Sequence, residues 1–305
     1  MFTAIAAMEK AITSMSIATE QQWHNVTVPD FEIRGYKNNQ LSKALQVSFA
    51  PLVNDRASWE AYANANQGWL EESLEMQAAL QAVENGESAR RALQEGSVPK
   101  IPSEVYRFSN GMVGDKQIGY ESDIYFGPGL YAPIWQQSPA PKDPSIINWD
   151  IFSDPVFQRI YHGMWETRLP VLSEVLNLDF LYGGAVKDDS EHPHSFLLHP
   201  VYKELMAGLH EKDDVTGVLI AVMSWDNYLS NLLIEGTNGI IVVLHDTCGD
   251  HFTYQIDGPS AIFLGEGDLH DPTFSVSTLP PSNERAFELS HYRIPSNLRA
   301  FFVTI

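Results

Sequence analysis

The sequence predicts an α+β fold in which antiparallel strands carry helices on one side. Two short apolar runs rich in Val and Ile, residues 215–222 and 239–244, have the length of buried strands. The clearest helix starts at Ser153, Asp154 and Pro155, where a side-chain oxygen caps the first turn and proline needs no N–H partner. With 305 residues the chain can bury a large core.

The first predicted element is a helix over residues 2–23. Its apolar side chains recur at heptad spacing, at Ile5, Met8, Ile12 and Met15. This stripe fits two structures, a helix packed on its own domain or the stalk of a parallel dimer, and both stay open.

Strand and helix patterns then alternate along the chain. We expect strands at residues 31–35 and 44–51, because apolar and polar residues alternate there. Asp55 or Ser58 begins a helix that contains Trp59 and Tyr62. Residues 70–93 have a helical composition, and the Gly- and Pro-containing region that follows makes residues 70–120 the best candidate for an insertion.

The second half of the chain predicts further helices and strands. The helix after Pro155 covers residues 156–164, and a second helix covers residues 225–233. Residues 186–194 are polar and acidic and predict a surface loop. The expected strands are residues 170–173, 195–198, 215–222, 239–244, 252–256 and an apolar strand from 298.

The charge of the chain excludes some partners. There are 39 acidic and 19 basic residues, so the net charge is -20, which repels nucleic-acid phosphates and anionic lipid headgroups. No run reaches the about 18 apolar residues that a membrane span needs. The first 18 residues contain Glu9 and Lys10 and lack a basic leader, so they do not read as a signal peptide.

Histidines are the main candidates for chemistry. Two groups have residue types that bind zinc, but their spacing does not suit a tetrahedral site, so we predict no metal and no cofactor. Acidic residues near position 266 predict a solvated turn rather than a calcium loop. We find no nucleophile elbow and no phosphate loop, and therefore predict no catalytic residues. The residues concerned are His192, His194, His199, His245, Cys248, His251, Glu266, Asp268 and Asp271.

Several stretches carry a resemblance to a known family. They are residues 49–53, 147–150, 153–155, 169–173, 196–203, 215–222, 225–229 and 239–246, an order of elements more than a strict motif. Over roughly residues 20–270 the chain resembles a CHASE domain, the extracellular sensory module of receptor histidine kinases and receptor nucleotide cyclases. With residues 192–198 and 265–272, it is most similar to the ectodomains of diatom receptor-type guanylate cyclases.

The resemblance implies a domain plan. Residues 1–28 would form a stalk helix and mediate a parallel homodimer. Residues 29–205 would form a membrane-distal PAS-like ligand-binding unit, residues 206–275 a membrane-proximal PAS-like unit, and residues 276–305 a truncated C-terminal segment. The module would lie on the extracellular side of the cell membrane, with membrane spans outside this chain. Cys248, the single cysteine, would have its partner outside the chain as well.

The resemblance also implies a ligand pocket. In related plant receptors an Asp between strand and helix binds the ligand, and Asp150 stands at the matching place. Ser173 replaces a Thr on the next strand, and the pocket would be lined by Tyr131, Ile134, Phe196 and Leu198. An alternative role for Asp150 is an Asx turn or helix cap.

Three functions remain open at this point. The first is a non-catalytic sensory ectodomain that binds a small molecule and signals to an intracellular cyclase or kinase. The second is an α+β enzyme that uses the histidine groups. The third is a ligand-free dimerisation module.

Overall fold

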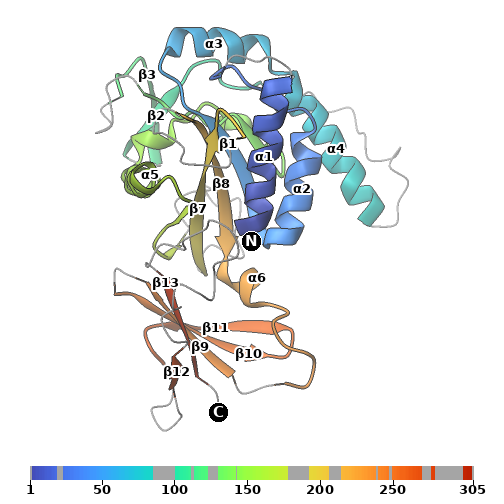
Figure 1. The fold of residues 1–305 in the computed structure, drawn as a ribbon, viewed down its shortest axis with the longest axis vertical. Coiled ribbons are helices and arrows are strands. Elements are labelled where there is room, and N and C mark those ends of the chain that lie inside the picture. Colours follow the sequence, from blue (N-terminus) through green and yellow to red (C-terminus); the bar gives the residue numbers. More distant parts are fainter. Residues whose placement is uncertain are drawn as a thin grey trace. The chain divides into compact units, whose positions relative to one another are not determined.

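The computed structural model describes residues 2–18, 23–84, 100–110, 113–122, 130–141, 143–177, 192–205, 214–237, 240–246, 249–269, 276–278 and 298–303. Helices and antiparallel strand pairs make up these parts, which confirms the α+β class (Figure 1). Cys248 and Asp271 lie outside the described residues.

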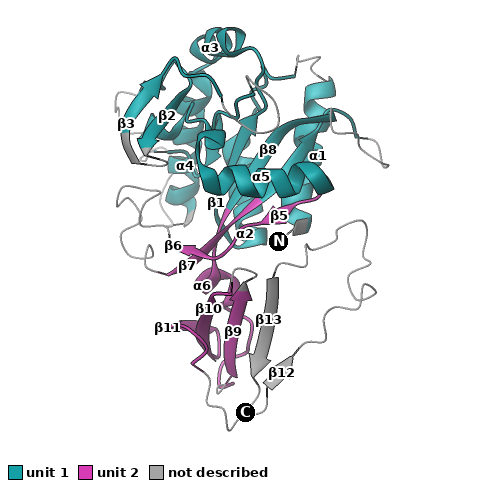
Figure 2. Cartoon of the chain, turned by 90° about the vertical axis from the view of Figure 1, so that its left-hand side faces the viewer, with its two compact units in different colours: residues 1–168, 198–221 teal, residues 169–197, 222–305 magenta. Residues whose placement is uncertain are grey.

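The chain divides into two compact units (Figure 2). Unit 1 contains residues 1–168 and 198–221, and unit 2 contains residues 169–197 and 222–305. The sequence had instead suggested a boundary near residue 205 and a separate segment from 276. The division falls within two long strands, β7 (Pro193–Tyr202) and β8 (Val215–Ser224), so each strand contributes to both units.

The N-terminal helix of unit 1 is shorter than predicted. Helix α1 (Phe2–Ala18) ends before the turn at residues 23–25. Its apolar stripe is buried within the single chain: the side chains of Ile5 and Ile12 are 0% exposed and that of Met8 is 5% exposed. These three side chains therefore pack within the chain's own unit 1. Side chains that are buried in this way are not available to form the seam of a dimer.

Helix α2 (Phe31–Ser42) replaces the strand expected at residues 31–35, so that expectation was wrong. The five-residue window alternates polar and apolar side chains, but the longer segment buries one helical face, formed by Phe31, Gly35, Asn38 and Ser42. Gly35 is required for this packing, because a Cβ there would meet the Ser138 Cβ at 2.2 Å.

A six-stranded sheet has the order β4-β1-β8-β7-β5, with β6 paired to β7. Its other strands are β1 (Ala44–Pro51), β4 (Gln136–Ser138), β5 (Val171–Leu172) and β6 (Leu176–Asn177). In Figures 1 and 2, helices α1 and α2 lie on one side of β1 and β8, and helix α5 (Pro155–Thr167) lies on the other. Unit 1 therefore has helices on both faces, not on one as predicted.

Two helices and a group of tryptophans build the core of unit 1. Helices α3 (Arg56–Ala65) and α4 (Gly68–Glu84) follow β1, and Asp55 caps α3 by accepting from the Ser58 N–H, as predicted. Trp135 packs edge-on against Trp59, with ring centroids 5.2 Å apart. Buried aromatic pairs of this kind contribute about 1 kcal/mol beyond their buried area.

The remaining elements of unit 1 lead toward the predicted ligand pocket. A hairpin of β2 (Tyr106–Asn110) and β3 (Val113–Ile118) is followed by the short 3-10 helices η2 (Pro144–Ile146) and η3 (Ile151–Ser153). Helix α5 then begins at the predicted place. Asp154 caps it by accepting from the N–H groups of Val156 and Phe157.

Unit 2 is built on a five-stranded antiparallel sheet with the order β11-β10-β9-β13-β12. The strands are β9 (Ile240–Asp246), β10 (His251–Asp257), β11 (Ser260–Glu266), β12 (Val276–Thr278) and β13 (Leu298–Val303), and helix α6 (Trp225–Leu229) precedes them. The core includes Val175, Trp225, Leu229, Val242, Leu244, Tyr254 and Ile256. Because β13 pairs with β9, residues 298–303 belong to this sheet.

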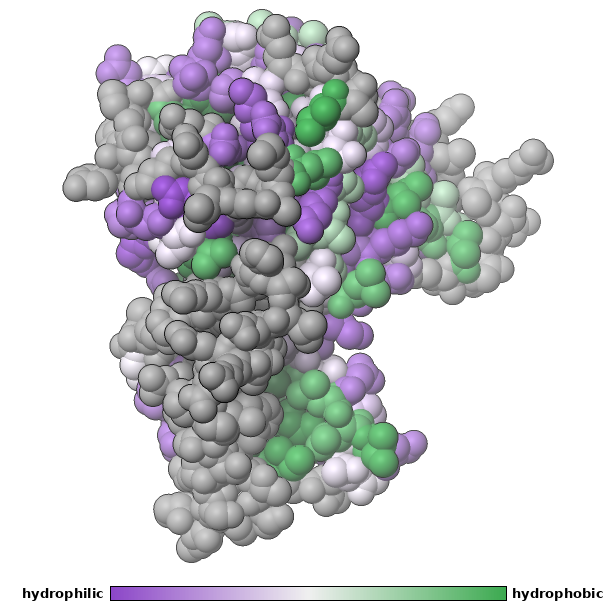
Figure 3. All heavy atoms as spheres, in the orientation of Figure 1, coloured by the Kyte–Doolittle hydropathy of each residue, from purple (hydrophilic) through white to green (hydrophobic). Residues whose placement is uncertain are grey.

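Strand β11 presents apolar side chains on both faces. Ala261 and Phe263 pack against the core of unit 2, whereas Ile262 and Leu264 point to the opposite face and are 46% and 44% exposed. Figure 3 shows apolar side chains gathered on this part of the surface. We call Ile262 and Leu264, together with the 53% exposed Leu269, the β11 patch.

Candidate ligand-binding site

Asp150 is buried and its side chain caps a helix. Its carboxyl is 1% exposed, and Oδ1 accepts from the N–H groups of Ala132 at 2.8 Å and Phe152 at 3.1 Å. Oδ2 accepts from the Tyr120 hydroxyl at 2.7 Å. The structure thus shows the helix-cap role that the sequence left open as an alternative, with both oxygens engaged inside the protein.

Burial changes the chemistry of this carboxyl. Desolvation raises the pKa of Asp150 to about 6, although its hydrogen bonds and the Arg56 guanidinium favour the charged form. The same burial, with the nearby Asp150 charge, raises the pKa of the Tyr120 hydroxyl. The shared proton therefore stays on the Tyr120 hydroxyl, which donates it to the Asp150 carboxylate. With both of its oxygens in use, this carboxylate is not available as a base for a ligand.

An arginine and two tyrosines surround Asp150. The Arg56 guanidinium lies 5.5 Å from the centre of the Tyr120 ring and 5.8 Å from that of Tyr131, which suits cation–π attraction. Tyr131 also donates to the backbone carbonyl of Tyr120 at 3.1 Å. Arg56 and Tyr120 were not predicted from the sequence as neighbours of Asp150. No short motif could indicate this contact, because both residues lie far from Asp150 in the chain.

Ser173 and Phe196 form a second, separate group in unit 2. The Ser173 N–H donates to the Phe196 carbonyl at 2.8 Å, and the Phe196 N–H donates to the Ser173 Oγ at 2.8 Å. The Ser173 hydroxyl donates to the Glu174 carbonyl at 2.6 Å. The hydroxyl therefore joins β7 to the segment that follows β5, and Ser173 is buried.

The six predicted pocket residues thus fall into different parts of the fold. In unit 1 the backbone of Tyr131 pairs with that of Val53, and the backbone of Ile134 pairs with Asn148 and Trp149, directly before Asp150. Leu198 is a fully buried residue of the unit 1 part of β7. Ser173 and Phe196 belong to unit 2. Neither of the two hollows described next is lined by any of the six.

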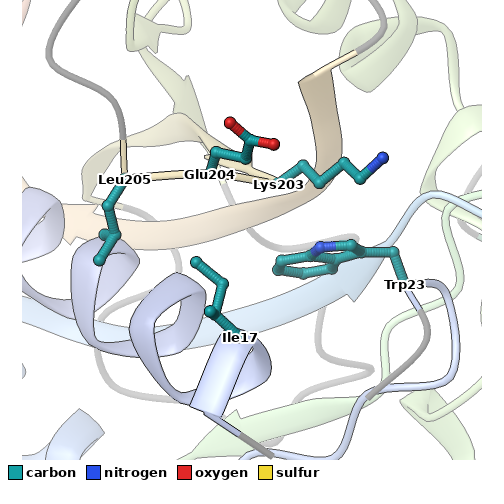
Figure 4. A pocket seen from close by; sticks show the side chains of 5 residues that line it. All are labelled: Ile17, Trp23, Lys203, Glu204 and Leu205. Carbon is teal, nitrogen blue, oxygen red and sulfur yellow. The ribbon is translucent and has the colours of Figure 1, made fainter. Parts of the chain in front are cut away.

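One hollow lies in unit 1 and is mostly apolar. It has a volume of about 550 Å³ and is lined by Ile17, Trp23, Lys203, Glu204 and Leu205. Figure 4 shows that Ile17 comes from the end of α1 and that Lys203, Glu204 and Leu205 come from the segment after β7. The hollow is wide open, and the charged side chains described in its lining are Lys203 and Glu204.

A second hollow, of about 470 Å³, lies within unit 2. Its apolar part is formed by five side chains, and its polar part includes two imidazoles and two carboxylates. The residues that line it are Val175, Leu176, His192, Pro193, Gly249, Asp250, His251, Phe252, Phe263, Glu266 and Gly267. We call it the unit 2 hollow. Its volume lies within the range of about 300–1,000 Å³ that is typical of small-molecule sites, and its lining surface is more polar than apolar.

His192 is held in place at the edge of this hollow. Its Nδ1 pairs with Oδ2 of Asp226, and its ring lies 5.6 Å from that of Phe263. Asp226 in turn accepts from the Tyr254 hydroxyl at 2.8 Å through Oδ1. Because an ionised carboxylate only accepts, His192 carries a proton on Nδ1, and in the neutral ring Nε2 is the acceptor.

The order of the fold explains why Asp226 is positioned for this role. Strand β8 ends at Ser224, whose Oγ accepts from the Asn227 N–H and starts helix α6, so Asp226 lies in its first turn. The Trp225 indole donates to the Ser195 Oγ at 3.0 Å. The sequence analysis singled out His192 but not its partners Asp226 and Tyr254, because no short motif contains the three.

His251 lines the same hollow as His192, and the remaining described histidines lie elsewhere. His194 and His199 are buried in β7, and burial lowers the pKa of His199 to about 4. Pro193 and His194 begin β7, so the loop expected up to residue 194 was wrong at its end. His245 stacks on His251, with ring centroids 4.1 Å apart. Among the described residues, no three His, Cys, Asp or Glu side chains are placed to hold a metal ion.

Comparisons with known proteins give no family for this chain. No protein-family model matches it, and no curated protein does. In the parts of the chain that the structure describes, no helix has both the length and the apolar character needed to cross a membrane.

Proposed function

We propose that this chain is a sensory module that binds a small molecule and signals to an intracellular output, a nucleotide cyclase of a parent receptor. The unit 2 hollow carries the binding part of the proposal, because it joins apolar walls to a few oriented polar groups. Two α+β units, which we propose to be PAS-like, and the resemblance to CHASE domains support the sensory part. An extracellular location is part of the same proposal.

The ligand is proposed to bind in unit 2 rather than at Asp150. Every polar atom of the Asp150 carboxyl is already hydrogen-bonded, so a ligand would have to displace the Tyr120 hydroxyl first. Losing that bond without replacement would cost about 1–3 kcal/mol. His192 faces no such barrier, because its side chain is 37% exposed.

One observation favours an enzyme as the second candidate. A carboxylate-oriented imidazole beside a hollow is the arrangement of a general base, and His192 with Asp226 has it. Among the residues described as lining the hollow none is Ser, Thr, Cys, Lys or Tyr, so a nucleophile there would have to be a carboxylate or an imidazole. We therefore place the sensory function first.

The third function, a ligand-free dimerisation module, has less support. The apolar stripe on which it depended is buried in α1 of the single chain. A homodimer through this helix stays a proposal, and it would have to use the exposed face that contains Ala7, Lys10 and Ser14.

The test is a screen of small metabolites by the shift that each causes in thermal unfolding of the full chain. A ligand of the unit 2 hollow should lose its effect in the His192→Ala variant and keep it in His162→Ala, a change at an exposed helix position. A ligand of Asp150 should instead bind more tightly to Tyr120→Phe. Mass spectrometry of the recovered compound separates the candidates: a sensor returns it unchanged, and an enzyme converts it.

A further inference from the structure

The carboxylates described in the unit 2 hollow are not balanced by a described cation. Among the described residues that line it, the ionisable side chains are Asp250 and Glu266, both exposed, and the imidazoles of His192 and His251, and none is Lys or Arg. The chain as a whole has a net charge of -20, which raises the local concentration of cations. An anionic ligand would therefore meet repulsion and no strong partner in this hollow.

Aromatic rings also line the same hollow. Phe252 and Phe263 both line it, and the Phe263 ring lies 5.2 Å from that of Tyr254. The negative faces of such rings attract organic cations such as ammonium groups. Rings with carboxylates at the rim suit a ligand that has a charged amine on an apolar body.

The backbone allows a ligand to come close. Gly249 has a φ of 97° and Gly267 a φ of 95°, and no Cβ narrows the rim at either position. The Gly267 N–H donates a hydrogen bond to the His251 carbonyl at 2.7 Å, and this bond holds the turn in place. His192 Nε2 adds an acceptor that an ammonium or amidinium group can reach.

We infer that the unit 2 hollow binds a small organic cation, a primary amine or amidine with an apolar or aromatic body. In this arrangement Asp250 and Glu266 attract the charge, His192 accepts a hydrogen bond from it, and Phe252 and Phe263 hold the apolar body. The inference rests on the proposed function, since it names the ligand class of the same site. Calcium is not the expected cation, because no three acidic or imidazole ligands converge among the described residues.

Isothermal titration calorimetry on the full chain tests the ligand class. The probes are phenethylamine, agmatine and putrescine, with phenethyl alcohol as the neutral match of the first, 3-phenylpropionate as an anionic match and calcium chloride as the inorganic cation. We expect at least one amine to bind, the alcohol to bind more weakly by about tenfold, since a hydrogen-bonded charge is lost, and the anion and calcium not to bind.

Isosteric variants locate the binding. Glu266→Gln and Asp250→Asn should each weaken amine binding by up to about fivefold, and both together by more, whereas Asp268→Asn should change it by less than about 1.5-fold. Asp268 is an exposed acid of the same turn that is not among the residues described as lining the hollow. All three positions are exposed, so folding should be unaffected. Amine binding that ignores Glu266→Gln and Asp250→Asn would overturn the inference, as would equal binding of amine and alcohol.

The same experiment separates the inference from the proposed function. If a neutral or anionic compound from the metabolite screen binds and His192→Ala removes it, the ligand class is wrong while the sensory site stands. If no compound of any charge binds in the hollow, both fail.

Discussion

At the scale of single residues, Asp150 shows how a carboxyl can be structural and still titrate. It is hidden from solvent and connects the N–H groups of Ala132 and Phe152 with the Tyr120 hydroxyl. Its pKa of about 6 lies above the about 3.9 of an unfolded aspartate. The folded chain therefore binds the proton of the Asp150 carboxyl more tightly than the unfolded chain does. This difference stabilises the fold fully below about pH 4, and the stabilisation is lost as the pH rises through about 6.

We predict that Asp150→Asn removes this part of the pH dependence. Asparagine keeps an oxygen for the two N–H groups but cannot ionise, so the variant should lack a decline of about 3 kcal/mol in unfolding free energy between about pH 4 and 7. Urea titrations at several pH values measure the difference from wild type. Asp55→Asn, at an exposed helix cap, is the matched control for replacing a capping aspartate by asparagine. Parallel profiles for wild type and Asp150→Asn would contradict the prediction.

At the scale of elements, the N-terminal helix α1 is part of the core of unit 1. Ile12 is fully buried, and the neighbouring Thr13 hydroxyl donates to the Tyr202 carbonyl at 2.8 Å, which ties the helix to β7. A helix held this firmly contributes to folding whether or not it also contacts a second chain.

We predict that Ile12→Asp destabilises the chain rather than only dissociating a dimer. A buried charge without a partner costs several kcal/mol, in addition to about 2–5 kcal/mol for the lost apolar side chain. Circular dichroism should show a large fall in the melting temperature. Ser14→Asp, on the exposed face, should melt like wild type. Sedimentation of this second variant tests the dimer: a wild-type dimer that persists in Ser14→Asp would exclude the exposed face of α1 as its interface.

A second prediction at this scale concerns β11, the edge strand of the unit 2 sheet. Edge strands with apolar side chains associate with other chains. We expect Ile262→Lys with Leu264→Lys to reduce self-association at high concentration and to leave the melting temperature nearly unchanged, because both positions are exposed. Light scattering measures the association. Leu41→Lys, at a 75% exposed position of α2, is the control and should have no effect on it.

Capped helices and long apolar strands were the elements that the sequence predicted best. The structure contains the predicted helix caps at Asp55 and Asp154. It also contains the strands β1, β8 and β9 where the apolar runs predicted them. Residues 31–35 failed, because a five-residue alternation is too short to separate a strand from one face of a helix. The unit 2 hollow could not be predicted either, since it joins residues from β6 to β11 that no motif connects.

At the scale of the whole molecule, the histidines are distributed rather than gathered. His194 and His199 lie inside β7, His192 pairs with Asp226, and His245 stacks on His251. Each arrangement uses the imidazole as a hydrogen-bonding or packing group. A structural zinc needs four ligands in tetrahedral geometry, which these pairs do not supply.

We therefore predict that the purified chain carries no stoichiometric zinc. Elemental analysis after dialysis should give well below one zinc per chain, and a chelator should leave the melting temperature unchanged, because a structural zinc site would contribute to folding. A chain denatured with zinc and refolded serves as the control for weak surface binding. One tightly held zinc per chain would show that residues outside the described parts complete a site.

The position of Trp225 next to Asp226 in the chain has a consequence for fluorescence. Of the chain's seven tryptophans, Trp225 is the one that belongs to unit 2, and it directly precedes Asp226, the partner of His192. Indole emission responds to nearby charge, so a cation that reaches His192 would shift the spectrum of this residue while the six tryptophans of unit 1 give a constant background. The chain thus carries its own fluorescent reporter next to the hollow, and binding there can be followed without a label.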